Sequence, residues 1–148
     1  MKGGSAWLAM CLLAGAVQAA QGPTVQDIEV LKTIPGGQWE LTSRVDHAEK
    51  ATPPQLGCLS AEGLARGLQE LVTTVQSEQR CTILLTSNTD ALGVLELRCP
   101  QDGRELVPAV MEFRRPAPDR LEVRSQLQFG PRSMHLAQDY QWKGACPQ

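Results

Sequence analysis

Cysteine is the residue type in this sequence best placed to do covalent chemistry. Five cysteines occur in 148 residues, and four of them lie in the body of the chain, at Cys58, Cys81, Cys99 and Cys146. A thiol oxidoreductase uses a close reactive pair such as C-x-x-C, but these four are separated by 23, 18 and 47 residues. The spacing therefore favours two structural disulfides over redox catalysis.

The N-terminus predicts export to a compartment where disulfides persist. Lys2 supplies a positive charge, residues 6–17 form an apolar run, and small residues follow up to Ala19. This is the pattern of a secretory signal. We expect cleavage after Ala19, which makes residues 1–19 a signal peptide and residues 20–148 a single disulfide-bonded domain outside the cytoplasm.

The same apolar run sets the expected relation to a membrane. It is too short for a membrane-spanning helix, which takes about 20 residues, and no later stretch approaches that length. Lipid attachment at Cys11 is disfavoured, because Met10 stands where a lipoprotein signal has a small residue. We therefore expect a soluble mature domain with no transmembrane segment.

Histidine could supply other chemistry, but neither copy lies in a recognisable motif. Nucleophilic hydrolysis needs a serine activated by a histidine, and the sequence holds no G-x-S-x-G turn. Asp46, His47 and Glu49 lie close together, and Met134 beside His135 offers ligands that copper favours. Alternation along a strand, however, sends Met134 and His135 to opposite faces. We predict no catalytic residue, no metal site and no cofactor.

The charge distribution argues against nucleic acid as a partner. The chain has a formal net charge of −2, and loss of Lys2 with the signal makes the remainder more negative. A weakly acidic chain has no obvious basic surface for phosphate groups. Arginines gather in the second half, but acids are interleaved with them, which predicts a solvated face of mixed charge.

Two segments have helical periodicity. Residues 24–33 predict a short helix, capped by Thr24 with Asp27 three residues on. Residues 60–76 predict the main helix, with Ser60 as the N-cap. Its apolar residues share one stripe, which we expect to dock on the core; they are Leu64, Leu68, Leu71 and Val75.

Strand periodicity dominates the rest. Alternation of apolar and polar residues predicts strands within residues 38–46, 81–85, 95–99, 107–113, 121–129 and 134–142. Pro108 indicates an edge or a bulge, and residues 51–55 are typical of a loop. Short connections favour an antiparallel meander. We predict an α+β fold: about five or six antiparallel strands, able to curl into a partial barrel, with the amphipathic helix on the apolar face.

Four cysteines allow three connectivities, and the register of one hairpin favours one of them. Folding the chain about Asp90 puts the apolar residues of two strands opposite one another on a single face. The opposed pairs are Leu85 with Leu95, Ile83 with Leu97 and Cys81 with Cys99. A directly opposed pair is within disulfide reach. We therefore prefer Cys81–Cys99, and Cys58–Cys146 follows by elimination.

Several phrases of the sequence together resemble a family of small exported bacterial proteins, the domain of unknown function 3617 family. The phrases are Pro35-Gly36-Gly37-Gln38-Trp39-Glu40, Cys58-Leu59-Ser60, the two middle cysteines and Gly144-Ala145-Cys146-Pro147. The first has one more residue between proline and tryptophan than the commonest form. The resemblance covers nearly all of residues 20–148. It implies a periplasmic, disulfide-bonded domain and carries over no catalytic residue.

These observations lead to one functional hypothesis and two alternatives. We predict a non-enzymatic binding or envelope-assisting module that meets an unknown protein or a small apolar ligand through its sheet or rim. A ligand role requires an apolar cavity above ~300 Å³, and a solid core would leave a protein-contact role. The alternatives are an envelope hydrolase, with a cleft joining histidine, serine and carboxylate, and a purely structural or stress-related envelope component. The sequence assigns no ligand-binding residue.

Overall fold

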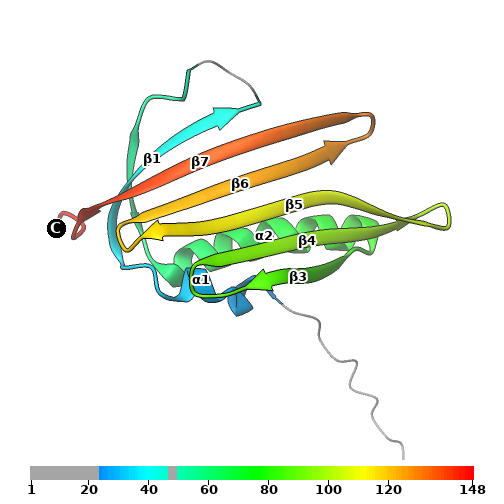
Figure 1. Ribbon diagram of the computed structural model, residues 1–148, viewed down its shortest axis with the longest axis horizontal. Coiled ribbons are helices and arrows are strands. Elements are labelled where there is room, and N and C mark those ends of the chain that lie inside the picture. Colours follow the sequence, from blue (N-terminus) through cyan, green and yellow to red (C-terminus); the bar gives the residue numbers. More distant parts are fainter. Residues whose placement is uncertain (1–23, 47–49) are drawn as a thin grey trace, which may run out of the picture.

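The computed structural model of the protein describes residues 24–46 and 50–148 (Figure 1). The predicted signal peptide with Cys11, and the candidate ligands His47 and Glu49, lie outside these residues. The strands are β1 (Gly37–Val45), β2 (Gln55–Leu59), β3 (Thr82–Asn88), β4 (Leu92–Gln101), β5 (Arg104–Ala117), β6 (Arg120–Phe129) and β7 (Arg132–Gly144). The helical elements are the 3₁₀ turn η1 (Val25–Asp27), α1 (Glu29–Lys32) and α2 (Ala61–Gln79).

The strands form one antiparallel sheet in the order β2-β1-β7-β6-β5-β4-β3. Strands β3 to β7 are the predicted meander, while β1 pairs with the last strand and carries β2 at its outer edge. The sheet stays open, because β2 and β3 are its two edges and do not pair. The α+β class and the antiparallel sheet are confirmed, but seven strands replace the predicted five or six.

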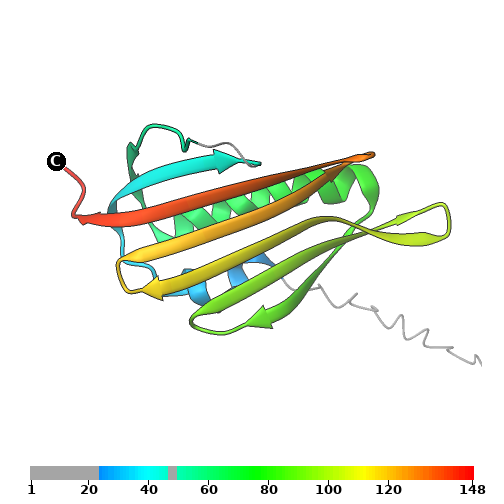
Figure 2. The same ribbon diagram turned by 45° about the horizontal axis from the view of Figure 1, so that its top comes forward.

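The topology explains why α2 covers one face of the sheet. The helix follows β2 at one edge and leads into β3 at the other, so the chain must cross the sheet between them. Figures 1 and 2 show α2 lying along a single face, roughly parallel to the strands. Leu64, Leu68 and Val72 of α2 pack on the core. Among the described residues no helix has the length and apolar character that crossing a bilayer demands.

Strand β2 is the element missing from the sequence prediction. Its residues are exposed except for partly buried Leu59, and Leu56 has 61% of its surface exposed. A strand with no buried face has no apolar alternation to reveal it. Its place is set by pairing with β1, from Gly37 opposite Leu59 to Leu41 opposite Gln55. The predicted loop at residues 51–55 therefore ends where this strand begins.

The predicted helix over residues 24–33 is wrong in one respect: it is split at Ile28. The backbone of Ile28 is extended and its side chain is fully buried. Asn88, from the end of β3, satisfies the backbone groups on both sides of this break. Its Oδ1 accepts from the N–H of Glu29 at 2.8 Å, and its Nδ2 donates to the carbonyl of Asp27 at 2.8 Å. A distant side chain thus replaces helical hydrogen bonds.

The core lies between the sheet and the helical elements. Its largest fully buried side chains include Trp39, Phe113 and Ile28. Gly93 lets α1 approach the sheet closely, since a Cβ there would lie 2.6 Å from Cγ2 of Ile28. At this density the space under the helices is filled by side chains.

Both predicted disulfides are present, Cys58–Cys146 and Cys81–Cys99. The hairpin register that favoured the second is confirmed, with Leu85 opposite Leu95 and Ile83 opposite Leu97 in β3 and β4. Disulfides persist in oxidising compartments, so the two bridges indicate a location outside the cytoplasm.

Candidate functional site

An open cleft of about 950 Å³ is lined by residues of β4, β5 and β6 together with Arg80, which follows α2, and Gly130, which follows β6. In Figure 1 it lies at the end of the molecule from which the β4–β5 hairpin projects, opposite the C-terminus. Its apolar wall consists of Cys99, Pro100, Leu106, Val107 and Pro108. Polar side chains lining the cleft are Arg80, Gln101 and Gln128. We call this feature the sheet-end cleft.

A bulge in the β4–β5 ladder produces the apolar wall. The register changes between Leu97 opposite Ala109 and Cys99 opposite Leu106. Pro108 lies within this irregularity, where its missing N–H costs no ladder hydrogen bond, as the sequence predicted. Beyond the bulge the hairpin leaves the covered part of the sheet, so Leu106 and Val107 keep 43% and 42% of their surface exposed.

Arg80 supplies the charge that lines the cleft. It is the residue after α2 and has a left-handed backbone, with φ of 54°. Glycine is the usual residue in this conformation at a helix end, and a side chain there costs about 1–2 kcal/mol. The following residue, Cys81, is buried and disulfide-bonded. The bridge therefore helps to hold the Arg80 backbone in place.

The arginines around the bulge differ in their partners. Arg98 pairs with Glu96 at 2.9 Å and with Glu105 at 3.1 Å, and the hydrogen bond that it donates to Glu96 raises the pKa of its guanidinium further. Arg80 has no carboxylate partner among the ion pairs of the described residues. The described side chains that line the cleft include no acid. The described lining of the sheet-end cleft therefore combines an apolar wall with one positive charge that has no ion-pair partner there.

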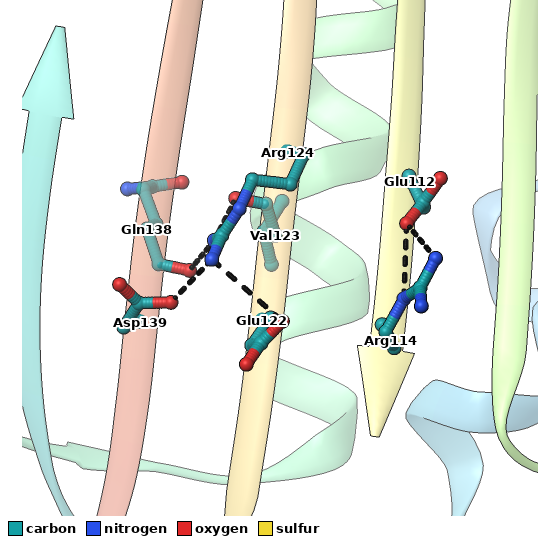
Figure 3. A network of polar contacts seen from close by, with 7 residues as sticks. All are labelled: Glu112, Arg114, Glu122, Val123, Arg124, Gln138 and Asp139. Atoms are coloured by element: carbon teal, nitrogen blue, oxygen red, sulfur yellow. Dashed lines mark hydrogen bonds and ion pairs between the residues drawn. The ribbon is translucent and has the colours of Figure 1, made fainter. Parts of the chain in front are cut away.

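The sheet face opposite α2 has a second hollow, of about 600 Å³, but its charges compensate one another. Figure 3 shows Arg124 between Asp139 at 2.8 Å and Glu122 at 3.7 Å, and it also donates to the carbonyl of Gln138 at 3.0 Å. Three cations and three acids line this hollow, namely Arg120, Arg124, Lys143, Glu40, Glu122 and Asp139. Exposed pairs of this kind contribute little to stability, and they leave no surplus charge for a ligand.

Of the residues that the sequence considered for metal binding, the structure describes Asp46, Met134 and His135. The Asp46 carboxylate accepts a hydrogen bond of 2.8 Å from the backbone N–H of His135, so it closes the end of the β1–β7 ladder. Met134 is partly buried and His135 exposed, as expected for opposite faces of a strand. Within residues 24–46 and 50–148, no three His, Cys, Asp or Glu residues come together as a metal site.

Of the residues that line the cleft, the sequence prediction singled out Cys99 as a disulfide partner and Pro108 as a sign of an edge or a bulge, but it assigned neither to a binding site. Two signals were available in retrospect. The adjacent pair Leu106 and Val107 breaks the alternation expected of a half-buried strand, and Arg80 stands at a helix end where glycine is common. Neither signal shows that the two features lie side by side, because that depends on how α2 and the hairpin meet.

Comparisons with known proteins do not place the chain in a family. No family model matches it, and no curated protein does. A solved structure of a redesigned β-barrel is similar over 79% of this chain and 97% of its own, with 9% identity and a TM-score of 0.23. A likeness of this size carries no functional argument.

Proposed function

We propose that this protein is an exported, non-enzymatic binding module that holds a small apolar ligand in the sheet-end cleft. The proposal includes a signal peptide over residues 1–19, cleavage after Ala19, a periplasmic location and membership of the domain of unknown function 3617 family. The observation that carries the binding role is the cleft of about 950 Å³ with an aliphatic wall left open to water.

The size and the wall of the cleft suit a small molecule. Ligand pockets commonly enclose about 300–1,000 Å³, and the cleft lies within that range. Leu106 and Val107 are more than 40% exposed. Covering such surface is favourable by about 25 cal/mol for each Å² removed from water. A ligand that lies along the hairpin would therefore gain free energy without disturbing the core.

Other locations in the described structure suit an apolar ligand less well. A hollow between α1 and the start of α2 has about 440 Å³, less than half the volume of the sheet-end cleft, and its side chains Val25 and Leu31 are no more than 2% exposed. Trp39, Phe113 and Ile28 fill the space between the sheet and the helices, each with no more than 2% of its surface exposed. This removes the expected version with a ligand inside a curled sheet, and the proposal places the ligand in the open cleft at the sheet end instead. The hollow on the opposite face is lined by charged side chains that pair with one another. Neither remaining alternative, a hydrolase or a structural component, has a supporting observation comparable to the cleft.

A neutral apolar dye tests this function. We expect N-phenyl-1-naphthylamine to bind with one-to-one saturation, detected as enhanced fluorescence. Leu106→Asp should weaken binding at least tenfold, because it places a charge on the apolar wall. Leu84→Asp is the matched control, since Leu84 is 38% exposed on β3 but does not line the cleft.

Two results would contradict the proposal. One is the absence of saturable dye binding to the oxidised protein. The other is an equal loss of affinity in the Leu84 and Leu106 variants, which would mean that the dye reports general surface or partial unfolding. Circular dichroism of each variant separates unfolding from a local change in the cleft.

A further inference from the structure

The polar part of the sheet-end cleft indicates what kind of apolar ligand it takes. We propose that the ligand is a single-chain anionic amphiphile, a fatty carboxylate, with its chain on Leu106 and Val107 and its head at Arg80. This inference rests on the proposed function and adds the charge of the ligand to it.

Charge complementarity is the first argument. Among the described residues, Arg80 lines the cleft, no acid lines it, and no ion pair neutralises Arg80. The guanidinium offers several N–H donors in a fork that matches a carboxylate. Among the polar neighbours, Gln128 already donates its amide to the carbonyl of Gly130 at 2.8 Å. Arg80 is therefore the strongest donor available to a ligand head.

The surroundings of the cleft keep that potential positive. The C-terminus of α2 contributes about half a negative charge, which is smaller than the full charge of Arg80. Arg104 and Arg132 begin β5 and β7 at the same end of the sheet, and no ion pair engages them among the described residues. Of the two described acids near the hairpin turn, Glu105 shares Arg98 with Glu96, and Asp102 lies in the turn itself.

Backbone conformation is the second argument. Arg80 occupies a left-handed position where glycine is the least strained residue. If Arg80 served only to end the helix, glycine would serve at least as well. The residue at this strained backbone position is instead an arginine whose side chain lines the cleft. Functional sites are where such strain is commonly found.

The test compares three amphiphiles with the same chain, each below its critical micelle concentration, by isothermal titration calorimetry. The probes are dodecanoate, dodecanol and dodecylamine. We expect dodecanoate to bind at least tenfold more tightly than dodecanol, and dodecylamine to bind most weakly. Arg80→Gly should remove the preference for dodecanoate while the melting temperature stays equal or rises, because glycine relieves the backbone strain.

Arg120→Gln is the matched control, since Arg120 lines the hollow on the opposite face; it should leave the preference intact. Equal binding of the three probes, or a preference that survives Arg80→Gly, would overturn the inference while the binding function stands. Failure of all three to bind would overturn both. Binding to phosphatidylglycerol vesicles without binding to monomeric dodecanoate would also overturn it, in favour of a membrane contact.

Discussion

The two ends of the sheet each have one disulfide, yet a buried tryptophan packs at one end and exposed aliphatic side chains line a cleft at the other. At the C-terminal end Trp39 is 2% exposed and its Nε1 donates to the carbonyl of Pro35 at 3.1 Å. At the hairpin end Leu106 and Val107 remain exposed around the sheet-end cleft. Figure 1 places these features at opposite ends of the molecule.

The two disulfides differ in exposure in the opposite sense to the apolar side chains near them. Cys58 and Cys146 are exposed at the C-terminal end, where Trp39 is buried. Cys81 and Cys99 are 7% and 3% exposed beside the cleft, where the aliphatic side chains are exposed. The comparison shows that a disulfide does not seal the end where it lies. A crosslink fixes backbone positions, while large apolar side chains exclude water.

The largest effect that can test this comparison is loss of the exposed bridge. Mild dithiothreitol under native conditions should reduce Cys58–Cys146 at least tenfold faster than Cys81–Cys99, because thiolate attack needs access to sulfur. The Cys58–Cys146 bridge spans 88 residues. Removing a crosslink over a loop of this length lowers the free energy of unfolding by about 4.5 kcal/mol in the chain-entropy description. Alkylation with mass mapping gives the order, and urea unfolding of the partly reduced protein gives the cost.

The Cys81–Cys99 bridge is the internal control. It spans 18 residues, and its reduction should lower the free energy of unfolding by about 3 kcal/mol for the same reason. Reduction of Cys81–Cys99 first, or of both at one rate, would show that burial in the folded state does not decide accessibility.

The next effect concerns apolar packing at the two ends. Trp39→Ala should lower the free energy of unfolding by about 3–5 kcal/mol, as is typical for a buried large aromatic. Leu106→Ala, at the open end, should change it by no more than about 0.5 kcal/mol. Urea unfolding measures both. Similar losses from the two substitutions would mean that the cleft wall is part of the core.

The smallest effect is the pH dependence of stability that arises from Asp27, which forms a capping box with Thr24 at the start of η1. The backbone N–H and hydroxyl of Thr24 donate to Oδ2 of Asp27 at 2.7 and 2.9 Å, and the backbone hydrogen bond is the main cause of the lowered pKa of this carboxyl. A carboxyl whose pKa is lower in the folded state stabilises the protein above its ordinary pKa of 3.8 and loses that contribution as the pH falls through the folded value.

We therefore expect the melting temperatures of the unmodified protein and Asp27→Asn to differ at pH 6 and to converge as the pH falls below 3.8 and through the lowered pKa of the folded state. A calorimetric series across this range measures the difference. A gap that is constant with pH would assign the effect of the substitution to something other than ionisation of Asp27.

Much of the fold could be predicted because local alternation carries it. The register between β3 and β4 places Cys81 beside Cys99, and a shift of one residue would turn the apolar residues of one strand outward. The helix from Ser60 was also predictable, and Ser60 Oγ accepts from the N–H of Gly63 at 3.0 Å. In these elements burial and secondary structure point to the same residues.

The errors in the sequence prediction occur where residues distant along the chain decide the local structure. Strand β2 is exposed except at its last residue and exists through its pairing with β1. The break at Ile28 depends on Asn88, 60 residues away along the chain. The cleft needs the end of α2, the bulge at Pro108 and the start of the β6–β7 turn to meet. No local sequence pattern indicates that these elements lie next to one another.

By itself the amino-acid sequence determined the register of the β3–β4 hairpin, the main helix, both disulfides and a chain with little net charge. Those properties follow from the period of apolar residues, from the four cysteines in the body of the chain and from its composition. Only the tertiary structure decided the seventh strand, the split helix and the juxtaposition of Arg80 with Leu106 and Val107. These depend on where the helix ends relative to the projecting hairpin, because contacts between distant residues are fixed by packing rather than by local periodicity.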